Sequence, residues 1–212
     1  MSLHPQLPFL VARLVILLAF CPSLWTQTIE FEQNGLRYKT LTKNGVTIMF
    51  APLPSHVREF SIVQVAVSNG SKIAWTVKPE DFTYQRDDGS TAQASPALQV
   101  VNSLIEKASR HDVIKLVSTY EAGLYGNTRL QSTNGYEVRR RNALAEVTSA
   151  RLKAAAAASA IAMVSTRLSP GESTDGAVFF ANSGKPLGPG KLRVHAAGEN
   201  FEFKSEPELV LR

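Results

Sequence analysis

Cysteine is almost missing from this sequence: Cys21 is the only one among 212 residues. A chain with one cysteine has no disulfide framework and lacks the cysteine pairs of a structural zinc site. Secreted eukaryotic domains of this size more often carry paired cysteines. If the chain is exported, the bacterial periplasm or cell surface therefore fits it better.

Motifs of catalysis are also absent. The sequence has no Gly-x-Ser-x-Gly elbow, phosphate-binding loop or dinucleotide-binding fingerprint. Beyond the N-terminal segment, the histidines are His56, His111 and His195. None has metal-ligand spacing except the adjacent pair His111-Asp112, whose side chains would diverge on a helix. His195 is expected to face solvent beside Arg193, because it has the opposite strand parity to the apolar residues around it. We therefore predict no enzymatic activity, no catalytic residue, no cofactor and no metal site.

Long hydrophobic runs are absent as well. Residues 14–20 form a short apolar run that follows Arg13 and precedes Pro22, which is typical of an export signal. The run is too short for a comfortable membrane span. We predict a signal peptide over residues 1–26, with an uncleaved membrane anchor as the alternative. Cys21 resembles the acylated cysteine of bacterial lipoproteins, but Phe20 stands where that motif has a small residue, so lipidation is not expected.

Charge of one sign is concentrated at only one place. The chain has 23 Lys and Arg against 18 Asp and Glu, a net charge of +5. The cluster is Arg139, Arg140 and Arg141, in the first turns of a predicted helix, where cations oppose the helix dipole. These arginines are the candidate partner-binding residues, for an acidic protein or anionic headgroups. The alternative is a solvated face with Glu137 and Glu146 as counter-ions. Nucleic acid is not expected, since aromatic residues are not interleaved with the basic ones.

Alternating apolar residues predict an antiparallel β-sandwich. The clearest stretch is residues 60–89, read as three strands with a hairpin turn at Asn69-Gly70 and a second turn at Asp88-Gly89. The apolar positions of these strands are Val63, Val65 and Val67, then Ile73, Trp75 and Val77, then Phe82 and Tyr84. Two or three earlier strands lie within residues 29–54, with the strongest hairpin signal at Asn44-Gly45. Closing strands are predicted at residues 177–180, 192–196 and 201–203.

Parts of this pattern resemble the secreted bacterial immunoglobulin-like domains of unknown function. The first part is Val65-x-Val67-x-Asn69, then Trp75-x-Val77-x-Pro79-Glu80-Asp81-Phe82-x-Tyr84 and Asp87-Asp88-Gly89. The second is Leu168-x-Pro170-Gly171-Glu172 with Gly176, Val178, Phe179 and Phe180. The resemblance covers about half of the mature chain. It implies an immunoglobulin-like sandwich and brings no catalytic residues, because such sandwiches serve in adhesion, assembly and binding alike.

A helical hairpin is predicted to interrupt the sandwich. Its first helix starts with Ser95 as the cap and Pro96 at the first helical position. The apolar face of this helix is expected to hold Leu98, Val101, Leu104, Ile105 and Ala108. After a break at His111-Asp112, the face is expected to continue through Val113, Leu116, Val117 and Tyr120, and Gly123 is the expected stop. The second helix, capped by Asn134, is expected over residues 136–167, with Ala154–Ala158 suited to close helix packing.

The predicted organisation is a signal peptide (1–26), the first part of the sandwich (27–95), the helical insertion (96–168) and the closing strands (169–212). The fold class is α+β, mainly β with an α insertion, and we expect the sandwich to fold without the helices. The expected function is that of an exported module in the periplasm or outside the cell, which binds an envelope or extracellular protein, or a second copy of itself, through the helical insertion. Membrane contact is expected only through an uncleaved N-terminal segment.

Two alternatives stay open. One is a hydrolase-type enzyme with a site between the insertion and the sandwich, in a pocket holding His111, Asp112 or Glu121. The other is a structural protein anchored to the membrane by its N-terminal segment. Partner identity and oligomeric state are not encoded in any recognisable motif.

Overall fold

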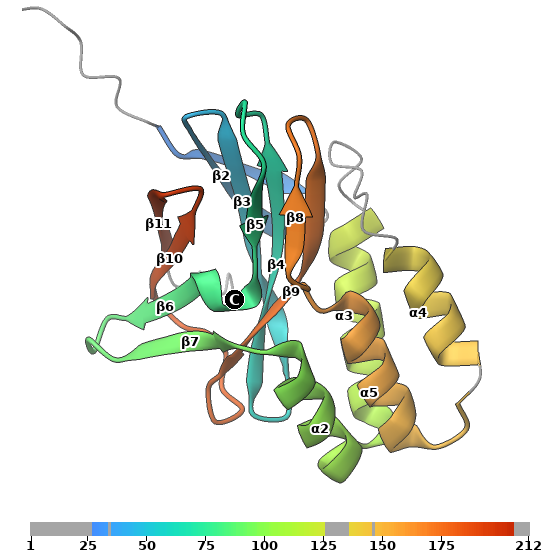
Figure 1. Cartoon of the computed structure of the whole chain (residues 1–212). Helices are drawn as coiled ribbons and strands as arrows, with labels where there is room; N and C mark the ends of the chain where they lie inside the picture. The colour runs from blue at the N-terminus through green and yellow to red at the C-terminus, as the bar shows by residue number, and fades with distance from the viewer. Residues whose placement is uncertain (1–26, 34, 126–135, 146, 206–212) are drawn as a thin grey trace, which may run out of the picture.

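The computed structural model describes residues 27–33, 35–125, 136–145 and 147–205 (Figure 1). The predicted signal peptide, Cys21 and the cap at Asn134 lie outside these ranges. Within them, no helix combines the length and the apolar character needed to cross a bilayer.

Antiparallel strands dominate the described chain, which confirms the α+β class with mainly β structure. Nine strands form one curled sheet in the order β1-β2-β3-β4-β9-β7-β6-β10-β11, and β5 pairs with β8. The strands are β1 (Ile29–Gln33), β2 (Leu36–Lys43), β3 (Val46–Val57), β4 (Phe60–Asn69), β5 (Trp75–Val77), β6 (Phe82–Arg86), β7 (Thr91–Ser95), β8 (Thr166–Leu168), β9 (Ser173–Ala181), β10 (Gly190–Ala196) and β11 (Glu199–Ser205).

Two of the predicted turns are confirmed. Asn44-Gly45 joins β2 to β3 with φ angles of 47° and 80°, the left-handed conformations that a two-residue hairpin turn requires. Gly89, at φ 83°, closes the hairpin of β6 and β7. The three closing strands are present as β9, β10 and β11.

The hairpin predicted at Asn69-Gly70 is wrong. β4 pairs with β3 and β9, whereas β5 pairs with β8, so that Trp75 lies opposite Leu168. Ile73 was expected to face the core, but it is 65% exposed. The physical reason is that the Asn69 side chain is fully buried and forms hydrogen bonds with the loop that follows it. Asn69 therefore fixes that loop and is not the first residue of a two-residue hairpin turn.

The sheet curls over at β7, and its two halves enclose an inner core. Thr91, Ala92 and Gln93 pair with β6, and the next two residues of the strand pair with β9. Val65 and Trp75 are buried in this core, as predicted. Phe50 of β3 meets Phe203 of β11 with ring centroids 5.0 Å apart, which brings an early strand against the last one. In Figure 1, β6, β10 and β11 lie on one side of the central strands, and the helices lie on the other.

The opposite face of the central strands is also apolar and is covered by helices α2 (Ala97–Lys107), α3 (Arg110–Tyr125), α4 (Tyr136–Ala145) and α5 (Ala150–Ile161). The buried residues of this outer core include Met49, Ala51, Ile62 and Phe179 from the strands and Val100, Leu104, Leu116, Ala154, Ala158 and Ile161 from the helices. The helical insertion is therefore one layer of a packed structure, and not a separate arm on a complete sandwich.

The single helix predicted over residues 136–167 is wrong. Residues 147–149 separate α4 from α5, and residues 166 and 167 belong to strand β8. After α5 the chain runs onto the sheet, where the Met163 amide donates to the Ala177 carbonyl at 2.8 Å. This crossing is possible because Gly176 lies beneath it, and a Cβ atom there would come within 2.6 Å of the Met163 Cα.

The predicted apolar face of the first helix is partly wrong. Of the predicted residues, Leu104 and Ala108 are buried and Val101 is partly buried, whereas Leu98 is 70% exposed and Ile105 is 41% exposed. Val100, which was not predicted, is buried. The cap of α2 is Pro96, because Ser95 still pairs with Phe179 as part of β7. The break falls at residues 108 and 109 instead of at His111-Asp112, and α3 continues past the stop expected at Gly123 to Tyr125, the last described residue of this range. The close packing expected of Ala154–Ala158 is confirmed for Ala154, Ala155, Ala157 and Ala158, which are all buried.

Candidate functional site

The three arginines singled out by the sequence lie on α4, but their surroundings differ. Arg141 is exposed, whereas Arg139 is partly buried. The Nε and Nη2 atoms of Arg139 are buried and have no hydrogen-bond partner among the described residues. The side chain of Arg140 lies outside the described part of the structure. Among these three arginines, an exposed side chain is therefore described only for Arg141.

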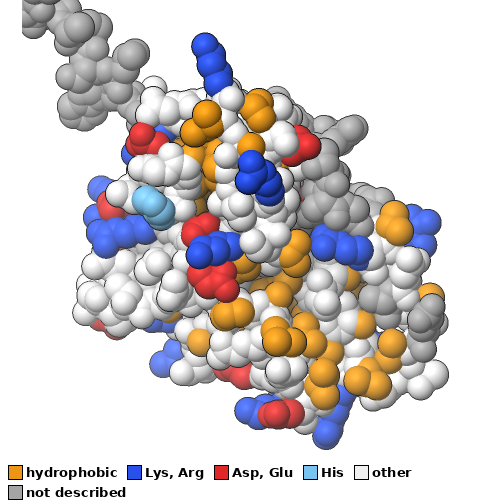
Figure 2. Space-filling view, in the orientation of Figure 1, with side chains coloured by type: hydrophobic (Ala, Val, Ile, Leu, Met, Phe, Trp, Pro, Cys, Tyr) orange, Lys and Arg blue, Asp and Glu red, His pale blue; other side chains and the backbone are white. Residues whose placement is uncertain are grey.

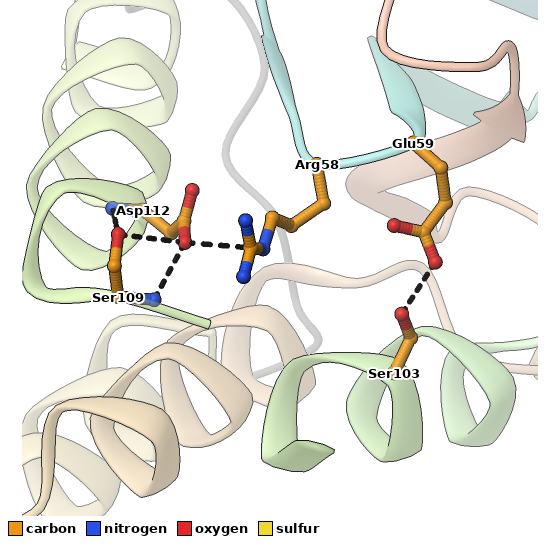
Figure 3. A network of polar contacts seen from close by, with 5 residues as sticks. All are labelled: Arg58, Glu59, Ser103, Ser109 and Asp112. Atoms are coloured by element: carbon orange, nitrogen blue, oxygen red, sulfur yellow. Dashed lines mark hydrogen bonds and ion pairs between the residues drawn. The ribbon is translucent and has the colours of Figure 1, made fainter. Parts of the chain in front are cut away.

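Asp112, a candidate for the enzyme alternative, is engaged in a structural network (Figure 3). Its Oδ2 accepts hydrogen bonds from the Ser109 backbone amide at 2.6 Å and from the Ser109 hydroxyl at 2.9 Å. The Ser109 hydroxyl also lies 3.4 Å from the Asp112 amide, so the two residues cap the first turn of α3 reciprocally. The Nε of Arg58, from the turn between β3 and β4, lies 3.5 Å from the same Oδ2. The Ser-x-x-Asp pattern of residues 109–112 is the sequence signal for this cap, but a break at His111-Asp112 was predicted in its place.

The neighbouring residue of that turn holds α2. Figure 3 shows Arg58 pointing toward α3 and Glu59 pointing toward α2. The Ser103 hydroxyl donates to Glu59 Oε1 at 2.5 Å. Burial alone would raise the pKa of Glu59, but this hydrogen bond, with the nearby Lys107 and Arg58, holds the pKa below its usual value. Arg58 and Glu59 therefore fasten the helical layer to the sheet, and Asp112 serves as the cap of α3 and the partner of Arg58.

A cleft opens where the two halves of the curled sheet separate. At one end of β2 the halves touch: the Lys43 ammonium donates to the Asn200 carbonyl, and Asn44 Nδ2 donates to Glu199 Oε1 at 2.7 Å. At the other end of β2, near Leu36, the strands diverge. Ser205, the last residue of β11, lies at this open end.

The cleft has a volume of about 350 Å³. Its walls combine charged side chains of β1 and β2 with apolar and proline residues. The lining residues are Glu30, Glu32, Gly35, Leu36, Arg37, Lys39, Phe50, Pro52, Pro54, Pro186, Leu187, Gly188, Pro189 and Ser205. None of His111, Asp112 and Glu121 is among the described residues that line it.

The charges of the cleft come from two paired strands. Lys39 is only 8% exposed, and its Nζ lies 2.7 Å from Glu30 Oε1. Arg37 and Glu32 are opposite each other on the same two strands and are both exposed. The cleft thus offers two cations along β2 beside two carboxylates along β1, over an apolar floor. Such a surface can bind a charged, extended chain. Across the described residues, no three His, Cys, Asp or Glu side chains are grouped as a metal site.

A second surface lies on the outer side of the helices. Its exposed large hydrophobic residues are Leu98 and Ile105 of α2, Val138 of α4 and Leu152 of α5. Figure 2 shows hydrophobic side chains gathered over α2 and α5, with Lys and Arg side chains and some Asp or Glu side chains at their edges. We call Leu98, Ile105, Val138 and Leu152 the helical patch. Most of the α5 alanines are buried and do not contribute to this surface.

His195 lies on β10 with its side chain exposed, as its parity predicted, and its Nδ1 is 3.0 Å from Asn200 Oδ1. His111 is exposed on α3, beside the buried Asp112. Comparison with known proteins supplied no relative: no family model, curated protein or solved structure matches this chain.

Proposed function

We propose that this chain is an exported, non-catalytic module of immunoglobulin-like type, in the periplasm or outside the cell, that binds another protein through the outer side of its helical layer. Two β layers packed around a Val, Phe and Trp core support the immunoglobulin-like part of this proposal. The N-terminal run at residues 14–20 supports export.

The helical patch is the observation that carries the proposal. Leu98 and Ile105 are one heptad apart on α2, so their side chains emerge from the same side of the helix. They stay exposed although the other side of α2 is buried against the sheet and α5. Exposed Lys107, Arg141 and Arg151 belong to the same layer. Glu106 of α2 is exposed as well. An exposed apolar surface of this kind fits a partner whose own surface is apolar.

The hydrolase alternative has less support. Of the three residues named for it, His111, Asp112 and Glu121, Asp112 caps α3 and pairs with Arg58. The described cleft lies at the open end of the curled sheet, lined by strand and loop residues, and not between the helices and the sheet.

A photo-crosslinking experiment tests the helical patch. A photoreactive amino acid replaces Asn102, an exposed residue of α2 between Leu98 and Ile105, in the full chain expressed in its native cells. We expect one protein adduct, and we expect the purified partner to bind the chain at least about tenfold more weakly after Leu98→Glu with Ile105→Glu. Both substitutions are at exposed positions, so the melting temperature should stay unchanged.

The control is Ile73→Glu, which adds one of the two negative charges at a 65% exposed isoleucine before β5. This control should keep the adduct and the affinity. An adduct that survives the double substitution, or a wild-type chain that forms only an adduct with itself, would contradict docking of a different protein on this surface.

A further inference from the structure

We infer that the cleft at the open end of the curled sheet is a second binding site, which takes an uncharged aromatic small molecule of about two fused rings. This site is separate from the helical patch and does not depend on the function proposed for that surface. It rests on the balanced charges of the cleft, on its rigid proline walls and on the size of its apolar floor.

The charges that line the cleft favour a ligand without a net charge. Lys39 Nζ lies 2.7 Å from Glu30 Oε1. Arg37 is opposite Glu32 in the register of β1 and β2. The lining therefore holds two cations and two carboxylates, which cancel. A charged ligand would have to compete with these pairs and would lose water on reaching the apolar floor, whereas an uncharged molecule avoids both costs.

The walls of the cleft are rigid before a ligand binds. Four prolines line it, namely Pro52 and Pro54 of β3 and Pro186 and Pro189 of the loop that leads to β10. A proline side chain has almost no rotamer freedom to lose. Hydrogen bonds also fix this loop, since Asn182 Nδ2 donates to the Pro186 carbonyl at 2.6 Å and the Tyr84 hydroxyl donates to the Gly188 carbonyl at 2.6 Å. Binding therefore orders few groups, which favours affinity.

The chemistry of the lining favours an aromatic ring over an aliphatic chain. The face of an aromatic ring is electron-rich, so it attracts a cation although the ligand has no net charge. The guanidinium of Arg37 is planar and exposed at the cleft, and it can stack on such a ring while its edge still faces Glu32. At the floor, the buried Phe50 ring offers an edge-to-face contact.

The size of the cleft sets the size of the ligand. Its volume of about 350 Å³ is near the lower end of the range for small-molecule sites, about 300 to 1,000 Å³. An apolar cavity of about 150 Å³ holds one benzene ring, so this cleft has room for about two fused rings, with a substituent at its open mouth. The buried side chains of Leu36 and Leu187 add aliphatic contacts to the rings.

Fluorescence titration of the full chain with two matched dyes tests the site. Phenylnaphthylamine is uncharged, and anilinonaphthalene sulfonate has the same rings with a sulfonate added. Both dyes brighten in an apolar site. We expect the uncharged dye to bind at least about tenfold more tightly. The net charge of +5 would by itself favour the sulfonate, so this preference reports the cleft and not the general surface.

Substitutions at the cleft locate the bound dye. Ser205→Phe should weaken the uncharged dye at least about tenfold, because Ser205 lines the cleft on the same face of β11 as Phe203 and the new ring would fill the site. Ser205 is partly exposed, so the melting temperature should stay unchanged. Lys204→Phe is the matched control, since it adds the same ring on the opposite face of the strand, and it should leave binding unchanged. Pro54→Ala, at an exposed wall position, should weaken the dye about threefold.

Four outcomes would overturn the inference. The first is no binding of the uncharged dye, and the second is a sulfonate dye that binds as tightly as the uncharged one. The third is binding that survives Ser205→Phe and is lost in Leu98→Glu with Ile105→Glu, which would place the dye on the helical patch. The fourth is binding to a variant that ends at Ser205 and not to the full chain, which would make residues 206–212 the occupant of the cleft.

Discussion

We expect Asn69 to be the most sensitive single polar position in the described structure. Its side chain is 0% exposed, and its Nδ2 donates to the carbonyls of Ile73 at 2.8 Å and Leu168 at 3.0 Å. Its Oδ1 accepts from the Ser71 amide at 3.0 Å and from the Ser71 hydroxyl at 2.6 Å. One amide group therefore joins the end of β4 to the following loop and to β8.

The magnitude follows from which partners can regain water. In Asn69→Ala, the partly exposed Ser71 groups can be rehydrated, whereas the buried Leu168 carbonyl loses its donor. The two hydrogen bonds lost from Nδ2 contribute about 1 kcal/mol each, and the unsatisfied Leu168 carbonyl adds about 1 kcal/mol. The expected loss in the free energy of unfolding is therefore about 3 kcal/mol. Asn69→Asp should lose more at pH 7, because a carboxylate would face two carbonyl oxygens. Burial beside those carbonyls should raise the pKa of the new aspartate, so this variant recovers stability as the pH falls toward 4.

Urea unfolding followed by circular dichroism measures these losses. The control is Ser71→Ala, which removes the hydroxyl contacts but keeps both bonds from Nδ2, and should cost about 1 kcal/mol or less. If Asn69→Ala were no more destabilising than Ser71→Ala, the bonds to Ile73 and Leu168 would contribute little, and Asn69 would not be the residue that joins β4 to β8.

Three further outcomes are expected. Gly176→Ala should destabilise by about 1–3 kcal/mol in the same assay, because its Cβ would meet the Met163 backbone. Gly89→Asn should cost about 1 kcal/mol or less, because its φ of 83° strains an L residue although the space around it is open and asparagine tolerates this conformation better than most residues. Ser103→Ala should raise the pKa of Glu59, because it removes a hydrogen bond to the carboxylate. A lowered carboxylate pKa stabilises the fold above about pH 4.3, and that stability is lost as the pH falls through the folded pKa, so this variant should lose about 0.5 kcal/mol at pH 7 and almost nothing at pH 2. Equal losses at both pH values would argue against the carboxylate contact. A chain without residues 97–164 should not fold, since it uncovers the outer core; a sharp thermal transition and a monomeric elution volume from this chain would contradict the layered packing.

The sequence was most informative where a few adjacent residues decide the conformation. Asn44-Gly45 and Asp88-Gly89 predicted turns because asparagine, aspartate and glycine tolerate positive φ, and both turns are present. It was least informative where distant segments meet. The helix expected over residues 136–167 has suitable local propensity, but its last part is a strand because Met163 and Leu168 find partners on β9 and β5.

The candidate surfaces show the same division. The three arginines stood out as a run of like charge, yet partial burial separates Arg139 from the exposed Arg141. Lys39 carried no signal, since a lysine that alternates with a tyrosine is normally on a solvated face. Its burial depends on the curl of the sheet, which no local pattern encodes.

The sequence by itself determined the apolar alternation of the central strands and the turns at Asn44-Gly45 and Gly89, because these properties depend on neighbours a few residues away. The tertiary structure decided that helices cover the second apolar face of β4, that β5 joins β8 and that β11 approaches β2 at one end only. Such contacts form between residues up to about 160 positions apart. They depend on how whole layers pack and twist, and the cleft exists because that twist separates the two halves of the sheet.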